Sequence, residues 1–147
     1  MDRVIDLDEA ATVIADRRAT WEAAGLVVEP VTWRDGAAPW PQRLETDRSR
    51  TQDPDSVGVH LHNALGDGAR RDAELLVVLY RGGWADIDYL VDAEDAGVLP
   101  SPALRSAQEF GALLDACVAR VFGDGAEDPT RRTATPGTAG PVGSRGE

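Results

Sequence analysis

Residues 74–91 read ELLVVLYRGGWADIDYLV, and this stretch indicates the architecture of the sheet most directly. Glu74–Tyr80 is the most apolar run of the chain, which is typical of a central strand. Gly82 and Gly83 follow, and two adjacent glycines favour a hairpin turn. Trp84–Val91 then alternates between two faces. One face carries Ala85, Ile87, Tyr89 and Val91, and the other carries Trp84, Asp86, Asp88 and Leu90. The stretch therefore predicts an antiparallel hairpin with one buried and one polar face.

Two further segments on the N-terminal side favour strands. Ser56–Asn63 alternates cleanly, as expected of a half-buried strand. Its apolar side carries Val57, Val59 and Leu61, and its other side carries Gly58, His60 and His62. Leu26–Val31 is a short apolar segment interrupted by Pro30. Together with the hairpin, these segments predict a three- or four-stranded antiparallel meander.

Helical periodicity marks both ends of the predicted domain. Leu7–Ala24 is expected to form a helix with Asp6 as its N-cap and Gly25 as its stop. The last helix is expected to open at Ser106, and it carries the strongest helical period of the chain. Its apolar positions are Phe110, Leu113, Leu114, Cys117, Val118, Val121 and Phe122. The order predicts an α+β fold, with both helices on one face of the meander and the other face partly open.

Composition divides the chain into a domain and a tail. The α+β domain is expected to cover residues 1–123. Asp124–Glu147 is rich in proline and glycine and has almost no apolar residue, which predicts a disordered tail. Within the domain, Thr32–Asp55 shows no period and predicts a long loop that carries Trp33 and Trp40. Leu65–Asp72 predicts a shorter loop, and Asp92–Pro102, with Gly97, Pro100 and Pro102, predicts another.

Charge and composition exclude several classes of protein. The chain has 26 acidic and 15 basic residues, a net charge of −11, which disfavours nucleic acid and anionic membrane surfaces as partners. No apolar run is long enough for a membrane helix, and the first residues lack the pattern of a secretory signal. With a single cysteine, the chain is expected to be cytoplasmic. All basic residues are arginine, which is typical of a bacterium with a high-GC genome.

Two pairs of side chains raise the possibility of a chemical site. His60 and His62 share one strand face, and Asp86 and Asp88 share another. Converging imidazoles and carboxylates would suit a metal ion or acid–base catalysis. Against this, polar residues alternate on the wet face of any antiparallel sheet, and Glu74–Tyr80 is expected to separate the two pairs. No nucleophile or phosphate-binding motif accompanies them, so the sequence favours a protein without catalytic residues, metal or cofactor.

Tryptophans point instead to binding of another protein. Trp84 alternates onto the polar face beside Asp86 and Asp88, where a large aromatic side chain has little core to fill. Aromatic anchors and steering charges are typical of protein interfaces. The predicted partner-binding residues are therefore Trp84, Asp86 and Asp88, with Trp33 and Trp40 as further candidates.

The order of these segments resembles the TriTu-type immunity proteins of bacterial polymorphic toxin systems. The resemblance covers about residues 5–123, and its most specific part is the turn and strand Gly83-Trp84-Ala85-Asp86. Trp84 and the length of the 32–55 segment depart from the family pattern. The other segments that carry it are Trp21–Gly25, Val28-Glu29-Pro30, Ser56-Val57, Glu74–Tyr80 and Ser106–Phe110.

The resemblance implies an immunity protein that binds and neutralises a cognate toxin. It implies no catalytic residue and no cofactor. Many toxins of such systems act on nucleic acids and are basic, and a partner with a charge of −11 would attract them. Two alternatives stay open. One is a small enzyme or metal-binding protein that uses His60, His62, Asp86 and Asp88, and the other is a chaperone or adaptor of a secretion apparatus.

Overall fold

The computed structural model describes residues 2–63 and 73–123. The loop expected at Leu65–Asp72 and the tail expected at Asp124–Glu147 lie outside the described residues. Within them the chain forms two α-helices, seven strands and one short 3-10 helix, the α+β class predicted from the sequence. The bounds are α1 Leu7–Ala23, β1 Leu26–Val28, β2 Thr32–Asp35, β3 Leu44–Glu45, η1 Arg48–Arg50, β4 Pro54–Asn63, β5 Glu74–Tyr80, β6 Trp84–Asp92, β7 Asp95–Leu99 and α2 Ala107–Phe122.

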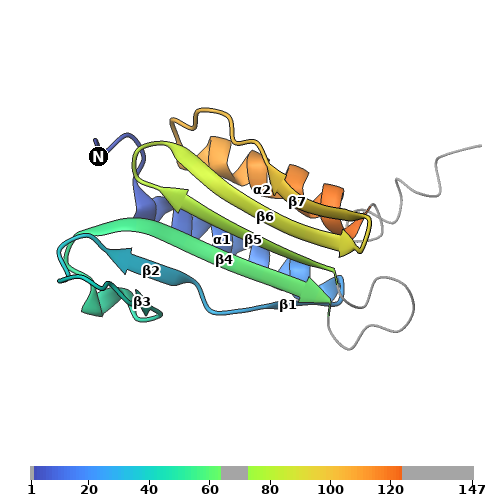
Figure 1. The fold of residues 1–147 in the computed structure, drawn as a ribbon, viewed down its shortest axis with the longest axis horizontal. Coiled ribbons are helices and arrows are strands. Elements are labelled where there is room, and N and C mark those ends of the chain that lie inside the picture. The colour runs from blue at the N-terminus through green and yellow to red at the C-terminus, as the bar shows by residue number, and fades with distance from the viewer. Residues whose placement is uncertain (1, 64–72, 124–147) are drawn as a thin grey trace, which may run out of the picture.

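The strands of the described residues form one antiparallel sheet in the order β3-β2-β4-β5-β6-β7. β1 and β2 both run along the same edge of β4, with Val28 opposite Leu61 and Thr32 opposite Gly58. Pro30 lies between them, and a proline has no N–H for the ladder. Figure 1 looks onto the strands, with α1 and α2 behind them. The expected helices on one face and open opposite face are confirmed, but the sheet is wider than the predicted meander.

The extra strands come from segments that the sequence pattern assigns to loops. Thr32–Asp55 forms β2, β3 and η1, so the prediction of a long loop is wrong. Asp35 is buried there and accepts hydrogen bonds from the backbone N–H groups of Ala37, Gln52 and Asp53 at 2.9–3.0 Å. These contacts join the two ends of the segment. They span up to 18 residues, and strands this short leave no period to detect.

The central hairpin forms where the sequence predicts it. Glu74–Tyr80 pairs with Trp84–Leu90, so that Tyr80 faces Trp84 and Val78 faces Asp86. Gly83 closes the turn with φ +94°, and a Cβ atom there would lie 2.5 Å from the carbonyl oxygen of Leu104. A glycine is therefore required at this position on two independent grounds.

Both helices begin as the sequence predicts. The Asp6 carboxylate accepts from the N–H groups of Asp8 and Glu9, and the Ser106 hydroxyl accepts from the N–H of Glu109. The Glu109 carboxylate accepts in turn from Arg105 N, one residue before the cap. These contacts satisfy N–H groups that have no partner inside a helix.

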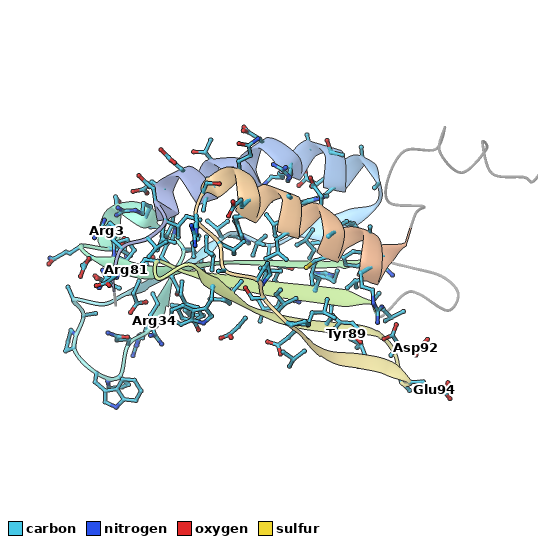
Figure 2. All side chains as sticks on the ribbon, turned by 90° about the horizontal axis from the view of Figure 1, so that it is seen from above. Arg3, Arg34, Arg81, Tyr89, Asp92 and Glu94 are labelled. Carbon is cyan, nitrogen blue, oxygen red and sulfur yellow. The ribbon has the colours of Figure 1, made fainter. Side chains whose placement is uncertain are left out.

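The core lies between the helices and one face of the sheet. Figure 2 shows both helices on the same side of the strands. Arg17 of α1 donates two hydrogen bonds to Asp115 of α2, at 2.8 and 3.1 Å, and joins the two helices. Cys117 is buried, and burial raises the pKa of its thiol to about 11, so it serves as a core residue. The fully buried side chains include Val57, Val59, Val77, Leu79, Ile87, Phe110, Leu114 and Val121.

Candidate partner-binding face

The sheet surface away from the helices is the candidate site, and we call it the open face. Residues that lie opposite each other on neighbouring strands have their side chains on the same face of the sheet. His60, Leu76 and Asp88 form one such row on the open face, and Tyr80 and Trp84 form another. Strand β5 is less buried than the sequence suggests. Leu76 and Val78 alternate onto the open face and are half-buried, whereas Leu75, Val77 and Leu79 are fully buried. The open face therefore has an apolar centre.

Trp84 lies on this face, as its alternation predicts. Its side chain is 42% exposed and stacks on Tyr80, with ring centroids 4.8 Å apart and an angle of 14° between the planes. Tyr80 Oη donates to Asp86 Oδ2 at 3.0 Å, and the Arg34 guanidinium lies 6.0 Å from the Tyr80 ring centroid. Partial burial and the Asp86 carboxylate raise the pKa of Tyr80. The contacts hold the indole in place while leaving much of its surface exposed.

Asp86 and Asp88 are exposed on β6, on the same face as Trp84. Tyr80 Oη is the donor to Asp86, and Asp88 lies opposite Leu76 and Val98 on the two neighbouring strands. The two carboxylates thus border the apolar centre.

The other two tryptophans do not share one environment. Trp33, a further candidate for partner binding, lies in β2 with 3% exposure and packs in the core, which leaves it almost no surface for a partner. The guanidinium of Arg48 covers its ring at 5.2 Å. Trp40 lies between β2 and β3 and is 85% exposed. Figure 2 shows this connection, beyond Arg34, extending from the sheet on the side opposite the helices.

His60 and His62 each pair with a glutamate on the open face. His60 Nε2 lies 3.0 Å from Glu74 Oε1, and His62 Nε2 lies 2.7 Å from Glu29 Oε2. The imidazole rings are 5.4 Å apart. The hydrogen bond to Glu29 raises the pKa of His62, and the same bond lowers the pKa of Glu29. The four side chains form the histidine–glutamate cluster.

Next to this cluster the open face is hollowed. The hollow measures about 360 Å³ and is lined by Glu29, Pro30, Leu44, His60, Glu74 and Leu76. Gly58 forms part of its floor, and a Cβ atom there would lie 2.9 Å from Thr32 Oγ1 and 3.3 Å from Val78 Cγ2. The backbone of β4 therefore forms the floor, and the walls combine apolar side chains with two carboxylates.

The structure keeps the predicted metal candidates apart. His60 and Asp88 share a row but Leu76 lies between them, as expected from the central position of β5. Two strand spacings amount to roughly 10 Å, too far for one ion. Among residues 2–63 and 73–123 no group of three or more histidine, cysteine or acidic side chains is placed to hold a metal ion.

Sequence reasoning misses several residues of the open face. An apolar run is ordinarily interpreted as a strand that is buried on both faces, and this interpretation misses Glu74, Leu76 and Tyr80. In the structure every second residue of β5 is less buried, and these three side chains lie on the open face. Glu29 and Leu44 reach the face through pairings of β1 and β3, for which the sequence holds no comparable signal.

Comparisons with protein-family models, with curated proteins and with solved structures found no match to this chain. Of the helices in the described part of the chain, none combines the length and the apolar character needed to cross a bilayer.

Proposed function

We propose that this protein is an immunity protein, which neutralises a cognate toxin by binding it through the open face. The observation that carries the proposal is Trp84, a 42% exposed indole held by Tyr80 on a sheet face bordered by Asp86 and Asp88. Large aromatic side chains that are already ordered lose little entropy on binding and dominate many interfaces. The resemblance to TriTu-type immunity proteins names the kind of partner.

Charge supports a basic partner. The net charge is −11. Several arginines of the described residues form ion pairs with carboxylates of the same chain. The remaining excess of carboxylates would accelerate association with a basic protein. The exposed side chains Trp40 and Leu44 extend the apolar area at the β2–β3 edge.

The test is binding to the product of the neighbouring gene, which the proposal predicts to be the toxin. Co-expression should restore growth of cells that produce the toxin, and the purified pair should bind in calorimetry. Trp84→Ala should weaken binding by about 30-fold, because a central aromatic anchor contributes about 2 kcal/mol. Trp84→Phe keeps a ring on Tyr80 and should retain most of the affinity.

Melting curves of both variants separate binding from folding. A folded Trp84→Ala protein that binds the toxin as tightly as the wild type would remove the open face from the proposal. Absence of growth rescue and of binding by the wild-type protein would refute the immunity function itself.

A further inference from the structure

We infer that the hollow on the open face receives an arginine side chain of the protein partner, whose guanidinium binds Glu29 and Glu74 in place of His60 and His62. This inference rests on the proposed binding of a basic protein at the same face.

The shape and the lining of the hollow fit this side chain. Pro30, Leu44 and Leu76 supply apolar walls for an aliphatic stem, and Leu44, which is 65% exposed, has apolar surface left for it to cover. Glu29 and Glu74 line the same hollow and can accept hydrogen bonds from the planar guanidinium fork. Lysine has a similar stem but offers only a point charge, so arginine suits two separate carboxylates better.

In the unbound protein each of the two histidines lies at hydrogen-bond distance from one of the two carboxylates. Each imidazole is about one-third exposed. Replacement of an imidazole by a guanidinium therefore gives each half-exposed glutamate a new partner and leaves no buried charge unpaired.

Protonation of His62 should oppose arginine binding. The hydrogen bond to Glu29 raises the pKa of His62. Below that pKa the His62 imidazole is a cation that holds Glu29, and above it the neutral ring competes only weakly. The other charged groups of this region are Asp88, in the row of His60, and Arg18, which donates to the backbone oxygens of Val28 and Glu29. Imidazole is the side chain that ordinarily titrates near neutral pH, so His62 is expected to set the pH dependence.

The probe is N-acetyl-arginine amide, and its neutral isostere N-acetyl-citrulline amide is the ligand control. The chain contains two histidines, so the imidazole Cε1–H signals in NMR spectra report on His60 and His62 without crowding. Addition of the arginine probe at pH 8 should shift both signals with saturation, and citrulline should not. The apparent dissociation constant should rise about fivefold on lowering the pH to 5.5, since protonated His62 then competes for the Glu29 carboxylate.

A pair of charge-matched double variants locates the site. Glu29→Gln with Glu74→Gln should weaken probe binding about fivefold or more, because it removes both charged acceptors. Glu9→Gln with Asp16→Asn changes the charge equally at exposed positions of α1, behind the sheet, and should leave it unchanged. Equal shifts with citrulline, or equal losses in the two double variants, would overturn the inference. The proposed function would survive either result, because toxin binding and its dependence on Trp84 are measured separately.

Discussion

At the residue scale, Leu114 shows how much of the fold depends on the contact of α2 with the sheet. Its side chain is fully buried on α2, between the helices and the sheet. Leu114→Ala should lower the free energy of unfolding by about 2–5 kcal/mol, because it removes buried methyl groups and leaves a cavity. Urea denaturation followed by circular dichroism measures the change.

Leu113 provides the matched control for this prediction. It is the neighbouring leucine of the same helix and is only half-buried at the edge of the core. Leu113→Ala should therefore cost clearly less than Leu114→Ala. Equal costs for the two variants would mean that α2 packs in a different rotation from the one described.

The tryptophans show which single residues can be predicted from the sequence. The pattern places Trp84 and Asp86 correctly because they belong to a long strand, whose alternation fixes the face of every side chain. It misplaces Trp33 because β2 has only four residues and its pairing partners come from β4, about 24 positions further along the chain. Burial of such a residue is decided by tertiary contacts that no local window contains.

At the scale of elements, a side-chain network joins the β6–β7 hairpin to the end of α2. Arg120 donates to both carboxylate oxygens of Asp95 at 2.9 Å, and Tyr89 Oη donates to the same carboxylate at 2.7 Å. The guanidinium also lies over the Tyr89 ring, 4.9 Å from its centroid. Arg120 and then Tyr89 lower the pKa of Asp95 to about 2.

This network predicts a specific dependence of stability on pH. The pKa of Asp95 is about 2 in the folded protein and 3.8 without these contacts, as in the unfolded chain. Ionised Asp95 therefore favours folding. The contribution is complete above pH 3.8 and is lost as the pH falls towards 2. Asp95→Asn should lower the melting temperature at pH 7 and reduce the loss of stability between about pH 4 and 2. Calorimetric melts across this range measure both effects.

Glu94→Gln is the control for Asp95→Asn, since it removes one negative charge from the same turn. Figure 2 shows Glu94 and Asp92 at the end of the hairpin, beyond Tyr89. The control should melt close to the wild type at pH 7. If both variants behave alike, the effect comes from the charge of the turn and the contacts with Arg120 contribute nothing.

Elements differ in how far the sequence determines them. The long strands β4, β5 and β6 and both helices can be predicted within about two residues, because periods and caps are local signals. The strands β2, β3 and β7 have two to five residues and are interpreted as loop from the sequence. β2 and β7 form because β4 and β6 offer unpaired edges, and β3 pairs in turn with β2, so all three depend on the assembled sheet. For the same reason the hollow, which needs Leu44 and Glu29, could not be predicted.

At the scale of the whole molecule, the charge is divided unevenly along the sheet. Figure 2 shows Arg3, Arg34 and Arg81 at one end and Asp92 and Glu94 at the other. The arginines at the first end are paired, Arg3 and Arg81 with Asp53 and Arg34 with Asp55. Asp86 and Asp88 on the open face and Asp92 and Glu94 at the β6–β7 turn are exposed, so these are the carboxylates that the proposed basic partner would meet.

This arrangement predicts how association depends on salt. Asp86→Asn with Asp88→Asn removes two charges beside Trp84 and keeps the side-chain shapes, and the new amide oxygen at position 86 can still accept from Tyr80. At low salt the association rate constant with the toxin should fall roughly three- to tenfold, and its dependence on ionic strength should flatten. The dissociation rate should change less, because rim charges act mainly before contact. Stopped-flow fluorescence of the four tryptophans can follow both rates.

The double variant Glu9→Gln with Asp16→Asn has the same net charge but keeps the carboxylates of the open face, so it should slow association less. An equal effect of the two double variants would show that the partner responds to the total charge and that the open face does not steer it.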